Sequence, residues 1–318
     1  MYNIVNKFIR EAKDYYLDKD LNKVKDKSAG EFCYEKYCEL IKNKFDPNDQ
    51  SKETKFLKSL IAGFLVWRCK SENIEIGCHT VTEISMKNYC VFKDCAGSQI
   101  MEPKYGYKNI IDFMIEPYKH EFIKQVKLRH ALKRILLCSS QSNCSHCKYT
   151  DNSNKVVLIV NDVVNNCDLI VICDHVVCTM SLGFLKENIK KLIEPIRLVP
   201  SEKLLAIERI GYGTVNKIFL IYDKPFWELN VTSFHPIWFL KENETIISKL
   251  DEINESNWFE NIPYFDIVKN HENILCAWLS GCEFVENFTD EKIARDCTIL
   301  IRKFFRDESI PEPKKVIK

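Results

Sequence analysis

Glycine is scarce in this chain, and a glycine-rich nucleotide-binding turn is missing. Only nine of the 318 residues are glycine, well below the roughly 7% of ordinary proteins. A Gly-x-Gly-x-x-Gly turn between a strand and a helix lets backbone amides approach a pyrophosphate. The single Gly-x-Gly here, Gly211-Tyr212-Gly213, precedes a strand-like run. This position indicates a turn that leads into a strand, and it argues against a phosphate-binding site.

An excess of charge of one sign and a long apolar run are also missing. Lys and Arg number 46 and Asp and Glu 45, which gives a formal net charge of +1 without long charge runs. The longest apolar stretch, residues 57–67, is interrupted and too short to cross a bilayer. The start is amphipathic and charged, without an apolar signal core, and the end carries no peroxisomal address. We therefore expect no nucleic-acid partner, no membrane and a cytoplasmic location.

Cysteine is abundant, with 15 residues. Without a secretory signal, most should be reduced and buried as small hydrophobic side chains. Cys144, His146 and Cys147, with Cys138 nearby, could form a zinc-binding module. A structural zinc usually takes four ligands from two such pairs, and no second pair exists, so a surface loop is favoured. Motifs of serine hydrolases and zinc proteases are absent.

The hydrophobic pattern predicts a mixed α/β fold. Helical spacing of apolar residues dominates the first hundred residues, and strand-like runs follow. The predicted helices are 4–12, 56–65, 109–114 and 201–209, the last capped by Ser201, with loops at 45–49 and 138–154. The predicted strands are 133–137, 155–160, 169–173, a short buried strand 174–179, 215–222 and 274–279.

A last helix is predicted after Thr289. This residue can cap it, and acidic residues follow at the positive end of the helix dipole. Its buried stripe should consist of Ile293, Cys297, Leu300, Ile301 and Phe304.

Three ordered motifs carry a resemblance to a known family. Residues 174–186 read DHVVCTMSLGFLK, residues 200–214 read PSEKLLAIERIGYGT, and residues 217–227 read KIFLIYDKPFW. This series closely resembles the flavin amine oxidase family, and within it the polyamine and spermine oxidases. Weaker similarity extends over most of the chain, from about residue 85 to residue 313.

The resemblance implies the domain organisation. It suggests a helical part of a substrate domain over 1–100, strands of a partial FAD-binding domain over 101–185, and the rest of the substrate domain, with a mixed sheet and helices, over 186–318. The family's opening glycine turn and closing G-E-A-T segment have no counterpart here, so we expect a fragment or truncated form. Sheet edges and apolar faces should then be exposed, and the isolated chain should be poorly soluble.

The resemblance also implies roles for single residues. Lys217, in the family's K-I-F-L, would lie near flavin N5 and hold a water, whereas on spacing alone it is a solvent-facing strand lysine. Leu132 and Thr179 would lie along the FAD, or else belong to ordinary strand core. Asp94 would attract a cationic amine substrate, or else lie on the solvated surface. Trp227 and Trp278 are expected to be packing aromatics.

The implied chemistry is oxidation of polyamines of the spermine or N-acetylpolyamine class by hydride transfer to FAD, with release of hydrogen peroxide. The alternative is a catalytically inactive homologue that acts by binding only. Neither the preferred polyamine nor an oligomeric state can be read from these residues.

Overall fold

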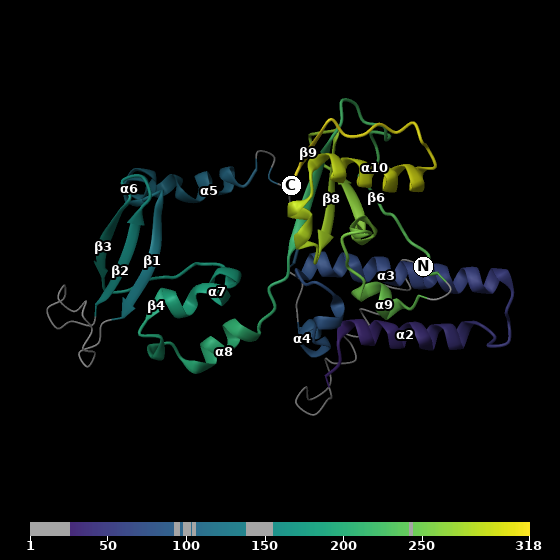
Figure 1. Ribbon diagram of the computed structural model, residues 1–318, viewed down its shortest axis with the longest axis horizontal. Helices are drawn as coiled ribbons and strands as arrows, with labels where there is room; N and C mark the ends of the chain where they lie inside the picture. Colours follow the sequence, from purple (N-terminus) through teal and green to yellow (C-terminus); the bar gives the residue numbers. More distant parts are fainter. Residues whose placement is uncertain (1–25, 92–95, 98–102, 104–105, 138–154, 242–243) are drawn as a thin grey trace. The chain divides into compact units, whose positions relative to one another are not determined.

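The chain folds into two compact units, one made of residues 1–102 and 213–318 and the other of residues 103–212. A computed structural model describes residues 26–91, 96–97, 103, 106–137, 155–241 and 244–318 (Figure 1). The helix predicted over 4–12 and the loop predicted over 138–154 lie outside these residues. Helices accompany one mixed and one antiparallel sheet, so the predicted mixed α/β class is confirmed.

The unit of residues 103–212 is built on a four-stranded sheet in the order β3-β2-β1-β4. The first three strands lie where strands were predicted and form an antiparallel meander, in which β2 and β3 are rich in β-branched residues; β4 runs parallel to β1. The turn between β2 and β3 is closed by Asp162, whose carboxylate accepts the backbone N–H groups of Val164 and Asn165 at 2.9 and 3.2 Å. The elements are α5 Lys108–Ile115, α6 Lys119–Gln125, β1 His130–Leu137, β2 Val156–Asp162, β3 Cys167–Cys173, α7 Leu182–Leu192, β4 Ile193–Glu194 and α8 Ser201–Arg209.

Two predictions for this unit are wrong. Residues 174–179 form no buried strand: they pair with no described strand, and Val177 is 85% exposed. The reason is that β3 lies at the edge of the sheet and the chain leaves the sheet after it. The helix over 201–209 exists, but Ser201 is its first residue and Pro200 occupies the cap position without a side-chain hydrogen bond. The domain boundaries implied by the resemblance, after residues 100 and 185, stay predictions; the two compact units divide after residues 102 and 212.

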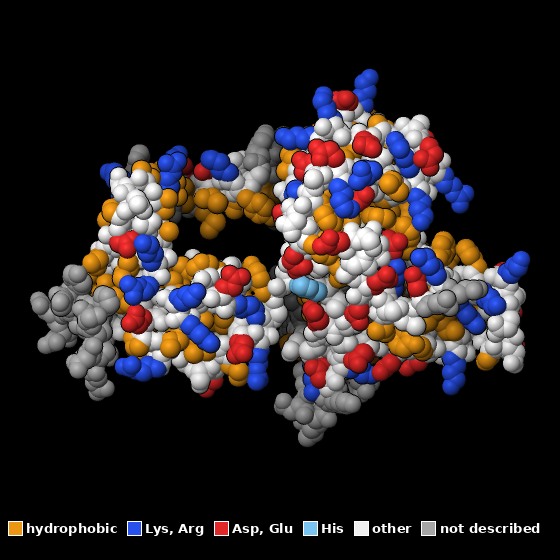
Figure 2. Space-filling model, viewed as in Figure 1, with side chains coloured by type: hydrophobic (Ala, Val, Ile, Leu, Met, Phe, Trp, Pro, Cys, Tyr) orange, Lys and Arg blue, Asp and Glu red, His pale blue; other side chains and the backbone are white. Residues whose placement is uncertain are grey.

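Apolar side chains are exposed on α5 and on the edge strand β3, as expected. Figure 2 shows hydrophobic side chains gathered along α5. Among them Ile111, Phe113 and Met114 are exposed, Phe113 to 82%. On β3, all of residues 169–172 are exposed. Since large apolar patches promote association, the poor solubility expected above remains a prediction for this chain.

The helices of the other unit begin and end at residues suited to those positions. Ser28 and Glu31 form a capping box at the start of α2. The C-cap of α3 is Gly77 with φ 74°, a left-handed conformation that favours glycine. The loop predicted over 45–49 separates the two helices, as expected, and no helix in the described part of the chain is long and apolar enough to cross a membrane. The helices are α2 Ala29–Lys44, α3 Lys52–Ile76, α4 Met86–Val91 and α9 Ile246–Asp251.

The five-stranded sheet is antiparallel, in the order β6-β7-β8-β5-β9, and buries one face against α10. The helix begins after Thr289, whose hydroxyl accepts the N–H of Lys292 at 3.2 Å, as predicted. Its buried stripe is shorter than predicted, because Phe304 is 37% exposed. Side chains of the shared core include Ile218, Leu220, Phe265, Leu275, Ala277, Cys297, Leu300 and Ile301. The elements are β5 Val215–Ile221, β6 Ser233–Phe234, β7 Tyr264–Ile267, β8 Ile274–Ser280, α10 Asp290–Phe305 and β9 Lys315–Ile317.

Gly213 lies where the chain passes close to the end of α3. Its N–H donates to the carbonyl of Gly77 at 3.1 Å. A Cβ atom on Gly213 would lie 2.4 Å from that oxygen and 2.6 Å from Cα of Cys78. The Gly211-Tyr212-Gly213 segment is irregular and leads into β5, as a connection into a strand was predicted to do, and its last glycine permits close backbone packing.

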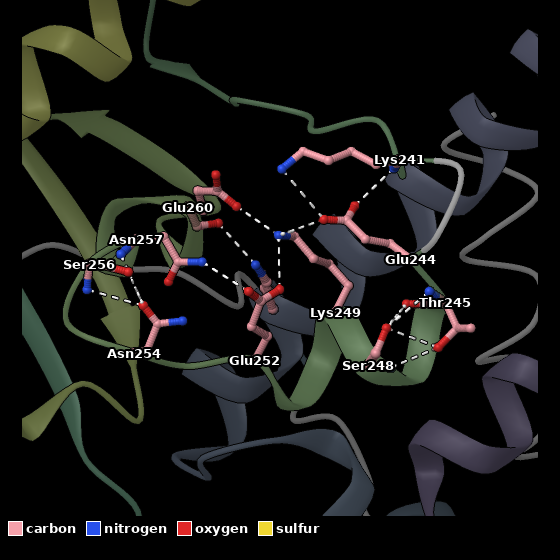
Figure 3. Close-up of polar contacts among 11 residues, drawn as sticks. Lys241, Glu244, Thr245, Ser248, Lys249, Glu252, Asn254, Ser256, Asn257 and Glu260 are labelled. Carbon is pink, nitrogen blue, oxygen red and sulfur yellow. Dashed lines mark hydrogen bonds and ion pairs between the residues drawn. The ribbon is translucent and has the colours of Figure 1, made fainter.

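A buried lysine, Lys249 on α9, joins three carboxylates (Figure 3). Its Nζ lies 2.7 Å from Glu260, 3.2 Å from Glu252 and 3.6 Å from Glu244. Burial alone would lower its pKa, but these carboxylates raise it above the ordinary value. Nearby, the buried Lys70 on α3 donates to the backbone carbonyl of Glu260 at 2.9 Å. These contacts attach α3 and α9 to the segment that leads into β7.

The first prediction concerns Gly213. We expect Gly213→Ala to lower the free energy of unfolding by about 1–3 kcal/mol, because the added methyl group overpacks the contact with Gly77. Gly211→Ala is the matched control, since a Cβ there meets no atom within 4 Å. Urea unfolding of both variants measures the difference. Equal stability of the two would contradict the packing role of Gly213.

The second prediction concerns Lys70. Burial, followed by the charge of Lys249, lowers the pKa of Lys70 from 10.5 to about 8. Between these values the unfolded chain binds a proton that the folded chain does not, so folding becomes more favourable as the pH rises. Relative to Lys70→Met, the wild-type free energy of unfolding should rise by a few kcal/mol, on the order of 3, from pH 8 to 10.5. Lys55→Met, an exposed change on the same helix, should show no such rise, and a flat difference for Lys70→Met would contradict the prediction.

Candidate active site

Lys217 lies on the face of the five-stranded sheet that α10 does not cover. Its neighbours Ile218 and Leu220 are buried against α10, whereas Lys217 is exposed, as the alternation of side chains along a strand requires. It pairs with Trp278 across the β5–β8 ladder, and its Nζ lies 4.2 Å from the centre of that indole ring. Within the described residues no carboxylate pairs with Lys217, so a cation lies on an aromatic surface without a counterion.

Aromatic rings continue from Trp278 across the sheet towards α3. Tyr264 lies opposite Trp278 on β7, with ring centres 6.3 Å apart. His235 follows at 5.9 Å from Tyr264, and Trp67 of α3 at 5.3 Å from His235. We call Trp278, Tyr264, His235 and Trp67 the aromatic row. The indole N–H of Trp67 donates to the carbonyl of Pro263 at 2.9 Å, whereas the buried N–H of Trp278 meets no acceptor among the described residues.

A second row of side chains lies beside the first on the same face. It consists of Phe219, Cys276 and Asp266, which occupy paired positions on β5, β8 and β7. Burial raises the pKa of Cys276 to about 12, with Lys217 opposing the shift and Asp266 adding to it. Cys276 is therefore a protonated thiol near neutral pH and no nucleophile. Lys217 and Asp266 both act on it because it lies between them.

Charged residues of α3 border the far end of the aromatic row. Arg68 forms an ion pair with Glu72, and its other guanidinium nitrogen lies 3.6 Å from Glu75. Burial raises the pKa of the Tyr264 phenol, and the charges of Asp266 and Glu75 raise it further, while Arg68 opposes them. Two carboxylates, one from the sheet and one from the helix, thus act on the same ring.

Desolvation lowers the pKa of His235 below its ordinary value, against a smaller opposing effect of the Pro263 carbonyl. His235 is consequently neutral at pH 7 and contributes an uncharged ring to the aromatic row.

The predicted site residues fall in different places. Lys217 belongs to the sheet face opposite α10 that is described above. Leu132 and Thr179 belong to the other unit, where Leu132 is half-buried beside a bulge in β1 and Thr179 is exposed after β3. Asp94 lies outside the described residues, as do all four candidate zinc ligands: Cys138, Cys144, His146 and Cys147. In the part of the chain that the structure does describe, no group of His, Cys, Asp and Glu could hold a metal ion.

Three residues of this face were not predicted from the sequence: Tyr264, Asp266 and His235. The alternation in Tyr264-Phe265-Asp266-Ile267 could have placed Tyr264 and Asp266 on one face of a strand. It could not have shown that this strand lies next to β8 and Trp278. Trp227, predicted as a packing aromatic, is buried in the core with α10.

Comparison with known proteins gives a family match over nearly the whole chain. The model of the flavin containing amine oxidoreductase family matches residues 20–318. The peroxisomal N(1)-acetyl-spermine/spermidine oxidase of Bos taurus is 31% identical over 148 residues, which cover 45% of this chain and 28% of that protein. The probable polyamine oxidase 5 of Arabidopsis thaliana is 30% identical over 146 residues, covering 44% of this chain and 24% of that protein.

A further relative is the possible lysine-specific histone demethylase 1 of Drosophila melanogaster, 28% identical over 173 residues that cover 51% of this chain and 17% of that protein. The matched stretches thus span 28% or less of these three relatives. Because the family model covers residues 20–318, the chain belongs to the flavin containing amine oxidoreductase family.

Proposed function

We propose that this protein takes part in FAD-dependent oxidation of polyamines of the spermine or N-acetylpolyamine class, with release of hydrogen peroxide. The observation that carries the proposal is Lys217, an exposed cation on the sheet face opposite α10, stacked on Trp278. It occupies the lysine position of the K-I-F-L motif that resembles polyamine oxidases. The names of two relatives, a spermine/spermidine oxidase and a probable polyamine oxidase, support this substrate class.

Lys217 and Trp278, on the sheet face opposite α10, suit a flavin ring. The Lys217 ammonium has no counterion among the described residues, and a cation suits a ring that becomes electron-rich on reduction. The buried Trp278 N–H has no acceptor in the described part of the chain. This N–H can therefore donate a hydrogen bond to a polar atom at the edge of a flavin ring. Leu132 and Thr179, in the other unit, stay predicted FAD contacts on the resemblance alone; Leu132 is half-buried and Thr179 exposed.

FAD, when bound, supplies the acceptor for a hydride from the amine carbon and passes the electrons to dioxygen. The protein's part is positioning and electrostatics. The Lys217 ammonium lowers the pKa of a substrate amine beside it, because two like charges repel, and so favours the neutral amine that can lose a hydride. Its N–H groups can also hold the water that hydrolyses the imine product. The rings of Trp278 and Tyr264 exclude bulk water from this end of the site.

The remaining expectations belong to the same proposal. Asp94 would attract the cationic substrate at the approach to the site. A cytoplasmic location is favoured by the cysteines, since those within the described residues are all free thiols and thiols persist in a reducing compartment. No nucleic-acid or membrane partner is proposed.

The third prediction tests Lys217 directly. With FAD added, we expect the protein to consume oxygen when spermine is supplied, and Lys217→Met to slow this reaction at least tenfold. The loss follows from removing the cation that favours the neutral amine and holds the water. Oxygen consumption and peroxide release are measured on the same samples.

Lys224→Met is the matched control, because Lys224 is an exposed lysine of the same segment and should keep wild-type activity. Both variants should unfold within about 1 kcal/mol of the wild type, since exposed substitutions change stability little. Equal rates for Lys217→Met and the wild type, or a wild type that oxidises no polyamine, would contradict the proposal.

A further inference from the structure

The strand β3 is an unprotected edge of the four-stranded sheet (Figure 1). It pairs with β2 on one side and with no described strand on the other, so alternate backbone N–H and C=O groups point away from the sheet. Natural edge strands usually carry a lysine, a proline or a bulge that prevents further pairing. Residues 167–173 read CDLIVIC, pair with β2 in an unbroken register and contain neither lysine nor proline. This edge can therefore accept another strand.

The side chains of β3 also favour a neighbouring strand. Leu169 and Val171 on one face, and Ile170 and Ile172 on the other, are 38–46% exposed. A strand beside β3 would cover apolar surface on both faces, which is favourable. The one charged residue of the strand is Asp168, and it already has a cationic partner in its own sheet, because Lys133 Nζ lies 2.6 Å away.

The backbone restricts how a second copy of β3 pairs with the first. In an antiparallel pair that continues the sheet, only the residues whose N–H and C=O point outward form the new hydrogen bonds, and these are every second residue. Facing residues must therefore be an even number of positions apart in sequence. The register that pairs all of Cys167–Cys173 meets this requirement, because it places Ile170 opposite Ile170 of the second copy and Cys167 opposite Cys173.

This register meets no electrostatic obstacle. Asp168 faces Ile172 of the second copy, and just beyond the strand Asp174 faces Asn166. No carboxylate thus faces another carboxylate, an arrangement that would be destabilising.

We propose that β3 pairs antiparallel with β3 of a second copy of this chain about a twofold axis at Ile170, which joins the two four-stranded sheets into one. Such a pairing uses both β3 edges, and the other edge strand, β4, has only two residues, so association stops at the dimer. One strand pair buries less than the roughly 1,200–2,000 Å² of a stable interface. The dimer is therefore weak, with a Kd on the order of 10–100 µM.

Two cysteines at the ends of β3 can report this register. Cys167 and Cys173 are free thiols, and across the dimer their Cα atoms would lie about 4.5–5.5 Å apart, within the range for a disulfide. Cys173 donates a weak hydrogen bond to the carbonyl of Val156 at 3.6 Å, which the sulfur would give up on oxidation. Two copies of Cys167 lie at opposite ends of the paired strands and cannot be joined.

The first test is sedimentation equilibrium of the purified full chain in reducing buffer, from about 1 to 200 µM, a range that brackets this Kd. Ile170→Lys places two lysines opposite each other at the axis and should weaken dimerisation at least about tenfold. Val163→Lys is the matched control, because Val163 is an exposed valine in the turn before β3; it should leave the dimer unchanged. Circular dichroism checks that both variants fold.

The second test traps the dimer and does not depend on the Ile170 variant. Diamide oxidises each facing thiol pair to a disulfide by taking up its two hydrogen atoms. Mixed Cys167→Ser and Cys173→Ser chains should form a covalent dimer, in which peptide mass mapping finds Cys167 linked to Cys173. Neither variant alone should give this link.

A wild-type chain that stays monomeric over the whole range would overturn the proposal. So would an equal loss of dimer in Val163→Lys and Ile170→Lys, association that continues beyond two copies and is unaffected by Ile170→Lys, or the absence of the Cys167–Cys173 link from the oxidised mixture. None of these outcomes depends on FAD or on amine oxidation, so they leave the proposed function to its own test.

Discussion

Burial of one face of the five-stranded sheet against α10 is the constraint on which the proposed site depends. Ile218, Leu220, Phe265 and Ala277 all point towards this helix, and fully burying each large apolar side chain contributes about 1.5–3 kcal/mol. Because side chains alternate along a strand, the residues between them must point the other way. Lys217, Trp278, Tyr264 and Asp266 share the opposite face for this reason. Slipping the register of one strand by one residue would exchange the two faces and is strongly disfavoured.

The second constraint is the attachment of α3 beside this face. Backbone contact between Gly77 and Gly213 fixes the end of the helix next to the start of β5. Trp67 and Lys70 bind the carbonyls of Pro263 and Glu260, just before β7. Burying a charged lysine is costly unless partners compensate it, and the carboxylates around Lys249 provide part of that compensation. This attachment brings Arg68 and Glu75 to the far end of the aromatic row.

Much of the fold could be predicted from the sequence because local patterns and long-range packing agree there. The runs that became β1, β2, β3, β5 and β8 contain clusters of apolar residues, β-branched ones above all in β2, β3 and β5, and each found a partner strand. Residues 174–179 also contain neighbouring valines, but they follow the edge strand β3 and pair with no described strand. Composition alone therefore predicted a strand that does not form. Likewise, both Pro200 and Ser201 suit a helix start, and only the backbone conformation shows which one precedes the helix.

The site was predicted only in part, for a related physical reason. Lys217 was identified through its motif, which is continuous in sequence. Its neighbours come from β7, β8 and α3, which are separated from it by 45 residues or more in sequence, as the printed numbering shows. No local signal records that Tyr264 pairs opposite Trp278, or that Asp266 faces the same way. Such contacts follow from strand order, and strand order is a property of the whole sheet.

The most direct test of the central claim is the absorbance spectrum of the purified protein loaded with FAD, desalted, and then mixed with spermine without oxygen. Flavin bands that survive desalting and bleach on addition of spermine would show that bound FAD accepts electrons from a polyamine, as proposed. Flavin that is lost on desalting, or that stays oxidised with spermine present, would contradict the proposed oxidase function.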